Sequence, residues 1–204
     1  MIDLENRGYV AGGGLRSPLG DLFYLNIPKN ASSQTSNLLE HAGWTHCTTN
    51  IFDTTMILLR DPVDRWISGF ATYASSYILG PNYGSDHFVD DYNQLTERLI
   101  FDNIKFDDHT EAQSRFVEQV RGHKVYFKIT KDKKDLINKL SDFTGENLNT
   151  LTVFDNDAEL NYDTKHLTEF FRSRIMANKE LESKIKQCYN KDYQLIETVK
   201  FYGT

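Results

Sequence analysis

The chain has 204 residues, which is enough for one compact α/β domain and too few for two. Its formal net charge of −6 at pH 7 argues against broad electrostatic binding to nucleic acid or anionic membranes, although a local group of cations can still bind one small polyanion. No apolar run approaches the ~20 residues of a membrane helix, and no signal peptide is evident, so we expect a cytoplasmic protein.

The first 21 residues are predicted to be a lead-in that precedes a single domain spanning residues 22–204. This lead-in contains Gly12-Gly13-Gly14 and Ser17-Pro18-Leu19-Gly20, a composition that is typical of loosely ordered chain. A triple glycine can also bind phosphate, but no predicted strand precedes this one. We therefore expect a flexible segment here.

Apolar segments and helical periodicity alternate through the rest of the chain. Buried strands are predicted over 22–27, 54–59 and 124–129. A helix that carries Leu38, Leu39 and Ala42 and ends at Gly43 is predicted after the turn at 28–35, and further helices are predicted over 62–79, 132–143 and 165–199, the last broken near Asn178 or Asn190. Residues 92–121 are predicted to be mainly helical in at least two pieces, with loops at 80–84 and 146–163. This order predicts a single, mostly parallel central sheet flanked by helices, with ligands bound beyond the carboxyl ends of its strands.

A small polar turn follows the first predicted strand. Residues 28–35 read Pro-Lys-Asn-Ala-Ser-Ser-Gln-Thr, so small side chains let the backbone approach a ligand while the next helix begins. Lys29 adds a positive charge, and the hydroxyl groups add donors. The pattern predicts a phosphate-binding turn that differs from the GxxxxGK loop of nucleotide kinases. The alternative is a helix capped by its serines, which explains Lys29 less well.

A second polar turn ends the second predicted strand, in the segment RDPVDRWISGF over residues 60–70. Asp61 is a suitable N-cap for the following helix, and Arg60 and Ser68 can reach one anion from either side of the helix start. We expect Arg65 to pair with Asp61 or Asp64 and so to support the turn. The alternative for the segment is an ordinary capped surface helix.

These segments resemble motifs of one enzyme family. PKNASSQT resembles the 5′-phosphosulfate loop of sulfotransferases that use 3′-phosphoadenosine-5′-phosphosulfate (PAPS), and RDPVDRWISGF resembles their 3′-phosphate motif, in the same order. Residues 107–113 are similar to the DxHWxPQ segment of the Golgi-type carbohydrate branch, with Thr110 and Ala112 in place of Trp and Pro. Residues 189–195 are similar to that branch's Y-x-x-D-aromatic-x-L ending.

The resemblance implies a P-loop-NTPase-like sulfotransferase fold and a set of donor-binding residues. It implies that Lys29 contacts the bridging oxygen of the phosphosulfate and that Arg60 and Ser68 hold the 3′-phosphate of PAPS and of its product PAP. The residues implied to hold the 5′-phosphate are Asn30, Ala31, Ser32, Ser33, Gln34 and Thr35.

The acceptor requires a general base, for which the resemblance favours His109, with Glu111 and His46 as alternatives. The implied reaction is in-line sulfuryl transfer to a hydroxyl or amine, most simply on a carbohydrate or glycolipid. We expect no metal, because neither of the two cysteines nor any carboxylate cluster has metal-site spacing. The expected partners are the nucleotide donor and a saccharide or small hydroxyl compound, without nucleic acid or membrane insertion, and the sequence does not indicate the oligomeric state. Two rival hypotheses are a kinase-like phosphotransferase and a non-catalytic PAP-binding module.

Overall fold

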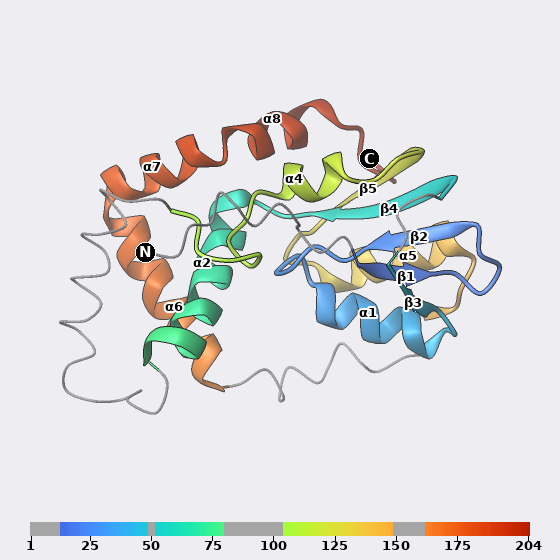
Figure 1. Ribbon diagram of the computed structural model, residues 1–204, viewed down its shortest axis with the longest axis horizontal. Helices are drawn as coiled ribbons and strands as arrows, with labels where there is room; N and C mark the ends of the chain where they lie inside the picture. Colours follow the sequence, from blue (N-terminus) through green and yellow to red (C-terminus); the bar gives the residue numbers. More distant parts are fainter. Residues whose placement is uncertain (1–12, 49–51, 80–103, 149–161) are drawn as a thin grey trace.

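Five strands form one mixed sheet in the computed structural model, which describes residues 13–48, 52–79, 104–148 and 162–204 (Figure 1). In chain order they are β1 (Gly14–Arg16), β2 (Leu22–Leu25), β3 (Thr45–Cys47), β4 (Thr54–Leu59) and β5 (His123–Lys128). Their order across the sheet is β3-β1-β2-β4-β5. β2, β4 and β5 pair in parallel, whereas β1 is antiparallel to both β2 and β3. The predicted α/β class is confirmed, whereas the sheet that was predicted to be mostly parallel is mixed, because two of its four strand pairings are antiparallel.

β1 corrects the prediction that residues 1–21 are a loosely ordered lead-in. Gly14 pairs with Leu25 of β2 and with Cys47 of β3, so the described end of this segment belongs to the sheet. A Cβ atom on Gly14 would lie 1.9 Å from the carbonyl oxygen of Tyr24, so the strand approaches its neighbour too closely for any larger residue. This glycine is therefore needed for the close packing of the strands, although in the sequence it indicated a flexible segment.

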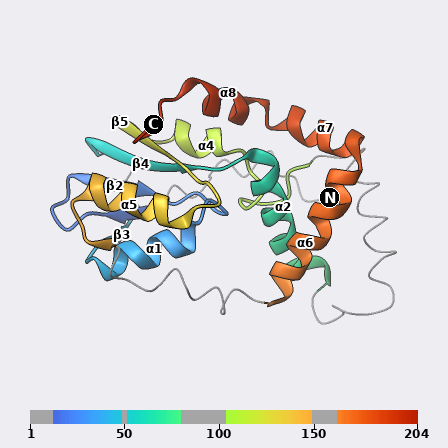
Figure 2. The same ribbon diagram turned by 180° about the vertical axis from the view of Figure 1, so that it is seen from behind.

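The helices occupy both faces of the sheet and one of its ends (Figures 1 and 2). They are α1 (Ser32–His41), α2 (Pro62–Tyr73), α4 (Gln113–Glu118), α5 (Lys133–Thr144), α6 (Tyr162–Ala177), α7 (Lys179–Cys188) and α8 (Asn190–Thr198), and a π-helix, η1 (Ala74–Leu79), continues α2. α1 and α5 lie on one face, α4 and α8 lie on the other, and α2, α6 and α7 pack together beside the sheet.

Most predicted helices are confirmed to within a few residues. The predicted 165–199 helix is divided at both of the anticipated places, Asn178 and the Tyr189–Asn190 junction. The prediction for 92–121 is wrong in part: residues 104–112 form turns, and only Gln113–Glu118 is helical. The described residues do not include 92–103, the predicted break at 80–84 or most of the predicted loop at 146–163.

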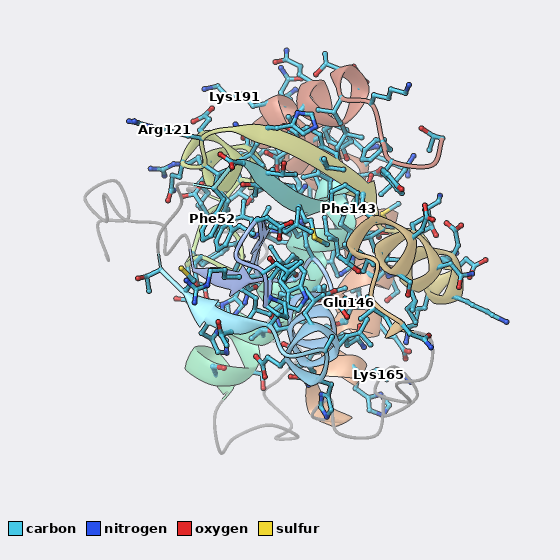
Figure 3. All side chains as sticks on the ribbon, turned by 90° about the vertical axis from the view of Figure 1, so that its right-hand side faces the viewer. Phe52, Arg121, Phe143, Glu146, Lys165 and Lys191 are labelled. Carbon is cyan, nitrogen blue, oxygen red and sulfur yellow. The ribbon has the colours of Figure 1, made fainter. Side chains whose placement is uncertain are left out.

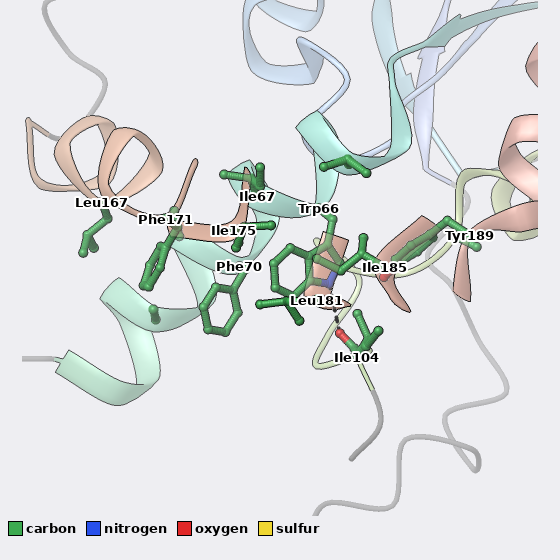
Figure 4. Packing of buried hydrophobic residues seen from close by; sticks show 14 residues of the cluster. Trp66, Ile67, Phe70, Ile104, Leu167, Phe171, Ile175, Leu181, Ile185 and Tyr189 are labelled. Carbon is green, nitrogen blue, oxygen red and sulfur yellow. Dashed lines mark hydrogen bonds between the residues drawn. The ribbon is translucent and has the colours of Figure 1, made fainter. Parts of the chain in front are cut away.

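Side chains of the central strands alternate between two cores, as the period of a strand requires. Met56 and Leu58 of β4 pack toward α1 and α5, while Ile57 and Leu59 pack toward Phe116 of α4. A third core joins α2, α6 and α7, and Figure 4 shows its aromatic centre. In it, the indole Nε1 of Trp66 donates a 3.0 Å hydrogen bond to the carbonyl oxygen of Ile104 (Figure 4). This bond ties the segment before the 107–113 loop to α2.

None of the described helices is both long and apolar enough to cross a membrane. Cys47 and Cys188 are free thiols.

Candidate functional site

The turn between β2 and α1 has an unusual backbone. Lys29 (φ 67°) and Ala31 (φ 53°) both adopt the left-handed conformation, which costs roughly 1–2 kcal/mol for a non-glycine residue. Asn30 between them is fully buried, and its Nδ2 donates to the carbonyl oxygen of Leu58 and to Oε1 of Gln113, both at 2.7 Å. The side chain of Asn30 therefore holds the turn against the end of β4.

The alternative of a serine-capped helix is wrong for α1. Its N-cap residue is Ala31, which makes no side-chain capping hydrogen bond, and Ser32 and Ser33 lie inside the first turn. No N-cap side chain therefore accepts from the first N–H groups of α1, and the helix start carries a partial positive charge that favours an anion.

Arg60 lies next to this turn, at the end of β4. One terminal guanidinium nitrogen of Arg60 donates a 3.2 Å hydrogen bond to the carbonyl oxygen of Lys29. The buried side chain of Gln113 fixes the Arg60 backbone on both sides, because its Oε1 accepts from the Arg60 N–H (3.0 Å) and its Nε2 donates to the Arg60 carbonyl (2.9 Å). Asp61 caps α2 as predicted, and its Oδ1 accepts from the N–H of Asp64 at 2.9 Å.

A cavity of about 580 Å³ opens between these two turns and α6. Its wall includes eight of the residues predicted from the sequence motifs, namely Lys29, Ala31, Ser32, Ser33, Gln34, Arg60, Ser68 and His109. The remaining two, Asn30 and Thr35, do not line it, because both side chains are fully buried in the protein. The side chains of these two residues therefore do not face the cavity, and Asn30 has the structural role described above.

α6 supplies a wall that the sequence analysis missed. The cavity is lined on this side by Lys165, Thr168, Glu169 and Arg172. Figure 3 labels Lys165 in its lower part. Arg172 also forms an ion pair with Asp64 of α2. These residues were missed because α6 is far from both motifs in the sequence and carries no motif of its own.

The cavity collects positive charge in a chain that is acidic as a whole. Burial is the main cause that lowers the pKa of Lys29 below its usual value of 10.5, and Arg60 and Arg65 lower it further while Asp107 and Asp108 oppose them. Burial likewise lowers the pKa of Arg60. Burial thus disfavours the charged forms of both side chains, and a bound polyanion would favour them.

His109 is oriented by two carboxylates. Its Nδ1 lies 2.9 Å from Oδ2 of Asp107 and 3.2 Å from Oδ1 of Asp108. Asp107 also accepts hydrogen bonds from the backbone N–H groups of His109 (3.0 Å) and Thr110 (3.2 Å), so it is held in place by the turn itself. These contacts favour a ring in which Nδ1 donates to a carboxylate, and in that tautomer Nε2 can accept a proton as a general base does.

The two alternative bases are engaged elsewhere. His46 is exposed and lies 2.8 Å from Oε1 of Glu40. Glu111 pairs with Lys105 (3.0 Å) and Arg115 (2.7 Å) and accepts from the Ala112 N–H. Although burial acts to raise the pKa of Glu111, these partners lower it overall, so this carboxylate is a weak base. Neither residue lines the cavity that contains Lys29.

Arg65 supports the site in a way that differs from the prediction. It is fully buried, and its guanidinium donates to three backbone carbonyl groups, those of Pro28 (2.9 Å), Asp108 (3.2 Å) and Glu111. The predicted pairing with Asp61 or Asp64 is wrong, because the side chain points into the protein and Asp64 pairs with Arg172. Arg65 thus joins the Lys29 turn to the loop that carries His109.

The expectation of no carboxylate cluster also needs correction. Ligand atoms of Asp107, Asp108 and His109 lie within 4.8 Å of one another, in a segment of turns that precedes α4. The same atoms form the His109 ion pairs described above.

No family model, no curated protein and no solved structure matches this chain.

Proposed function

We propose that this chain is a sulfotransferase that transfers the sulfuryl group of PAPS to an acceptor hydroxyl or amine. One observation carries the proposal: Lys29 from the first motif and Arg60 and Ser68 from the second line the same cavity. β2 and β4 are parallel neighbours, so their carboxyl ends meet at one edge of the sheet, and the cations and hydroxyl groups of both turns line that one cavity. The proposal includes the finer assignment of the β2–turn–α1 unit to a P-loop-like sulfotransferase fold.

The cavity suits a nucleotide with phosphate at two positions. Its volume of about 580 Å³ is within the ~300–1,000 Å³ that is usual for small-molecule sites. The N-terminus of α1, with Ser32 and Ser33, would hold the 5′-phosphate, and Arg60 with Ser68 would hold the 3′-phosphate. Lys165 and Arg172 of α6 add positive charge on the opposite wall.

The reaction assigns a separate task to each residue. Nε2 of His109 takes the proton of the acceptor hydroxyl as its oxygen forms a bond to sulfur, and the bond between sulfur and the bridging phosphate oxygen breaks. The electron pair of that bond leaves with the 5′-phosphate of PAP, and the positive charge of Lys29 stabilises it. Asp107 stabilises the imidazolium that forms, in the manner of a carboxylate beside a catalytic histidine.

The direct test is transfer of ³⁵S from labelled PAPS to a panel of saccharides, glycolipids and phenols. The wild type should label at least one acceptor, whereas Lys29→Ala should lose most transfer and still bind PAP. Lys139→Ala is the matched control, because Lys139 lies on α5 in an ordinary i,i+4 ion pair with Asp135. Wild-type protein that binds PAP and labels no acceptor would favour the non-catalytic module, and phosphoryl transfer from ATP would favour the kinase-like alternative.

A further inference from the structure

A second cavity, of about 600 Å³, adjoins the first. Asn26 and Pro28, at the carboxyl end of β2, line both cavities. The two neighbours Asp108 and His109 lie on opposite sides of the boundary, because Asp108 lines the second cavity and His109 lines the first. The proposed base is therefore at the junction of two cavities, only one of which is needed for the nucleotide.

The wall of the second cavity carries several polar side chains. Arg16, Asn26, His46, Thr48 and Asp108 supply donors and acceptors, and apart from the imidazole of His46 its described residues include no aromatic ring and no large aliphatic side chain. The backbone of Gly13 is also open, since a Cβ atom there would have nothing within 4 Å. A wall of this kind suits a ligand with many hydroxyl groups better than it suits a phenol or a lipid tail.

Arg16 gives the second cavity a charge preference. Its side chain is exposed, and within the described ranges it has neither a hydrogen bond nor an ion pair, whereas His46 pairs with Glu40 and Asp108 pairs with His109. Its planar guanidinium is suited to a carboxylate, which it can bind through two parallel hydrogen bonds.

We propose that the second cavity binds the acceptor and that Arg16 selects a polyhydroxylated acceptor bearing a carboxylate. This inference rests on the proposed sulfuryl transfer. The acceptor hydroxyl would reach His109 at the junction, give up its proton to Nε2 and receive the sulfuryl group from the nucleotide in the first cavity. Asn26, which borders both cavities, would hydrogen-bond to the acceptor beside the reacting hydroxyl.

The test compares two probes that differ at one carbon, methyl β-glucuronide and methyl β-glucoside. Each is titrated by NMR into protein saturated with PAP, so the readout does not depend on turnover. The wild type should bind the glucuronide roughly tenfold more tightly, the ratio that 1.4 kcal/mol produces. Arg16→Gln should remove this preference and leave PAP affinity unchanged. Arg121→Gln, at an exposed residue labelled far from Lys165 in Figure 3, is the matched control and should retain the preference.

The possible failures are distinguishable. Equal binding of the two probes, or a preference that survives in Arg16→Gln, overturns the acceptor inference while PAP binding and transfer can stand. Wild-type protein that does not bind PAP overturns the proposed function itself. Because Arg16 is an exposed strand residue, its Gln variant is expected to fold, and its thermal unfolding midpoint should match that of the wild type.

Discussion

Gly69 of α2 lies so close to His109 that a Cβ atom at position 69 would be 2.2 Å from the His109 carbonyl oxygen. The glycine follows Ser68 in the second motif, so the helix that carries one donor-binding residue also sets the position of the proposed base. Replacing a glycine by alanine inside a helix normally stabilises the helix by about 0.5–1 kcal/mol. In this protein it must displace the 107–110 turn.

Gly69→Ala is therefore expected to destabilise the protein by about 1–3 kcal/mol, as overpacked positions do. Transfer should fall because His109 moves, whereas PAP affinity should change little because Lys29 and Arg60 are not displaced. Chemical denaturation, calorimetric PAP titration and kcat measure the three quantities. An alanine variant that is more stable than the wild type, with unchanged kcat, would contradict the structure at this contact.

Asp192 of α8 supports the same loop from the other side. Its buried carboxylate accepts hydrogen bonds from the backbone N–H groups of Gln113 (2.8 Å) and Ser114 (2.9 Å), and so caps α4 from a distant part of the chain. Asp192→Ala should lower the free energy of unfolding by about 3 kcal/mol, since two charge-assisted bonds are lost and two N–H groups remain buried. It should also reduce kcat, because Gln113 carries the network around Arg60 and Asn30.

Asn178→Ala provides the control for Asp192. Asn178 caps α7 through a 3.1 Å hydrogen bond from the Leu181 N–H, so its loss should cost only about 1 kcal/mol. Because α7 contributes no residue to the cavity that contains Lys29, transfer should be unaffected. Equal effects of the two substitutions on kcat would show that Asp192 does not position the loop.

The lowered pKa of Lys29 predicts how nucleotide binding depends on pH. Below that pKa the ammonium is charged and binds phosphate. As the pH rises from this lowered pKa toward the usual 10.5, Lys29 of the free protein loses its positive charge. The affinity for PAP should therefore fall over this interval. Over the same interval the unfolded chain binds the extra proton, so the stability of the free protein should rise with pH. Lys29→Arg keeps its charge and should bind PAP with a flatter pH profile.

A calorimetric titration series above pH 7 checks the Lys29 prediction, because the nucleotide phosphates have their second pKa near ~6 and titrate below this interval. A wild-type profile that is as flat as that of Lys29→Arg would mean that Lys29 does not contact the nucleotide.

Arg60 should determine the preference for a 3′-phosphate. Arg60→Lys keeps the charge but loses the planar guanidinium, so PAP affinity is expected to fall roughly tenfold while AMP affinity is nearly unchanged. The ratio of the two dissociation constants, measured by calorimetry, isolates the 3′-phosphate contact. A loss of the same size for AMP would assign Arg60 to the 5′ end instead, which its hydrogen bond to the Lys29 carbonyl makes geometrically reasonable.

The sequence predicted the parts of the fold that local patterns determine. Apolar runs located β2, β4 and β5, and the capping residue Asp61 located the start of α2. In the structure the N-caps of α2 and α5, Asp61 and Asp132, both accept a hydrogen bond from the N–H three residues later. It could not predict β1 and β3, because each is only three residues long and depends on pairing with distant chain. Gly14 illustrates the difficulty, since glycine indicates a loop unless the neighbouring strand is known.

The candidate site likewise contains residues that the sequence could identify and residues whose roles it could not predict. Motif residues such as Lys29, Arg60 and Ser68 could be named from the sequence, because each motif is contiguous. The roles of Arg65 and Gln113 could not, since an arginine that donates to three carbonyl groups looks, in sequence, like any helical arginine near two aspartates. Asp192 could be identified only as part of the 189–195 segment that is similar to a family motif. Its contact with the N-terminus of α4 joins residues almost eighty positions apart.

The most direct test of the central claim is a calorimetric titration of the wild-type protein with PAP and, separately, with ATP and magnesium. If Lys29 and Arg60 bind opposite ends of one nucleotide, PAP should bind with a stoichiometry of one and at least tenfold more tightly than ATP with magnesium. ATP with magnesium binding as tightly as PAP, or PAP not binding at all, would contradict the account.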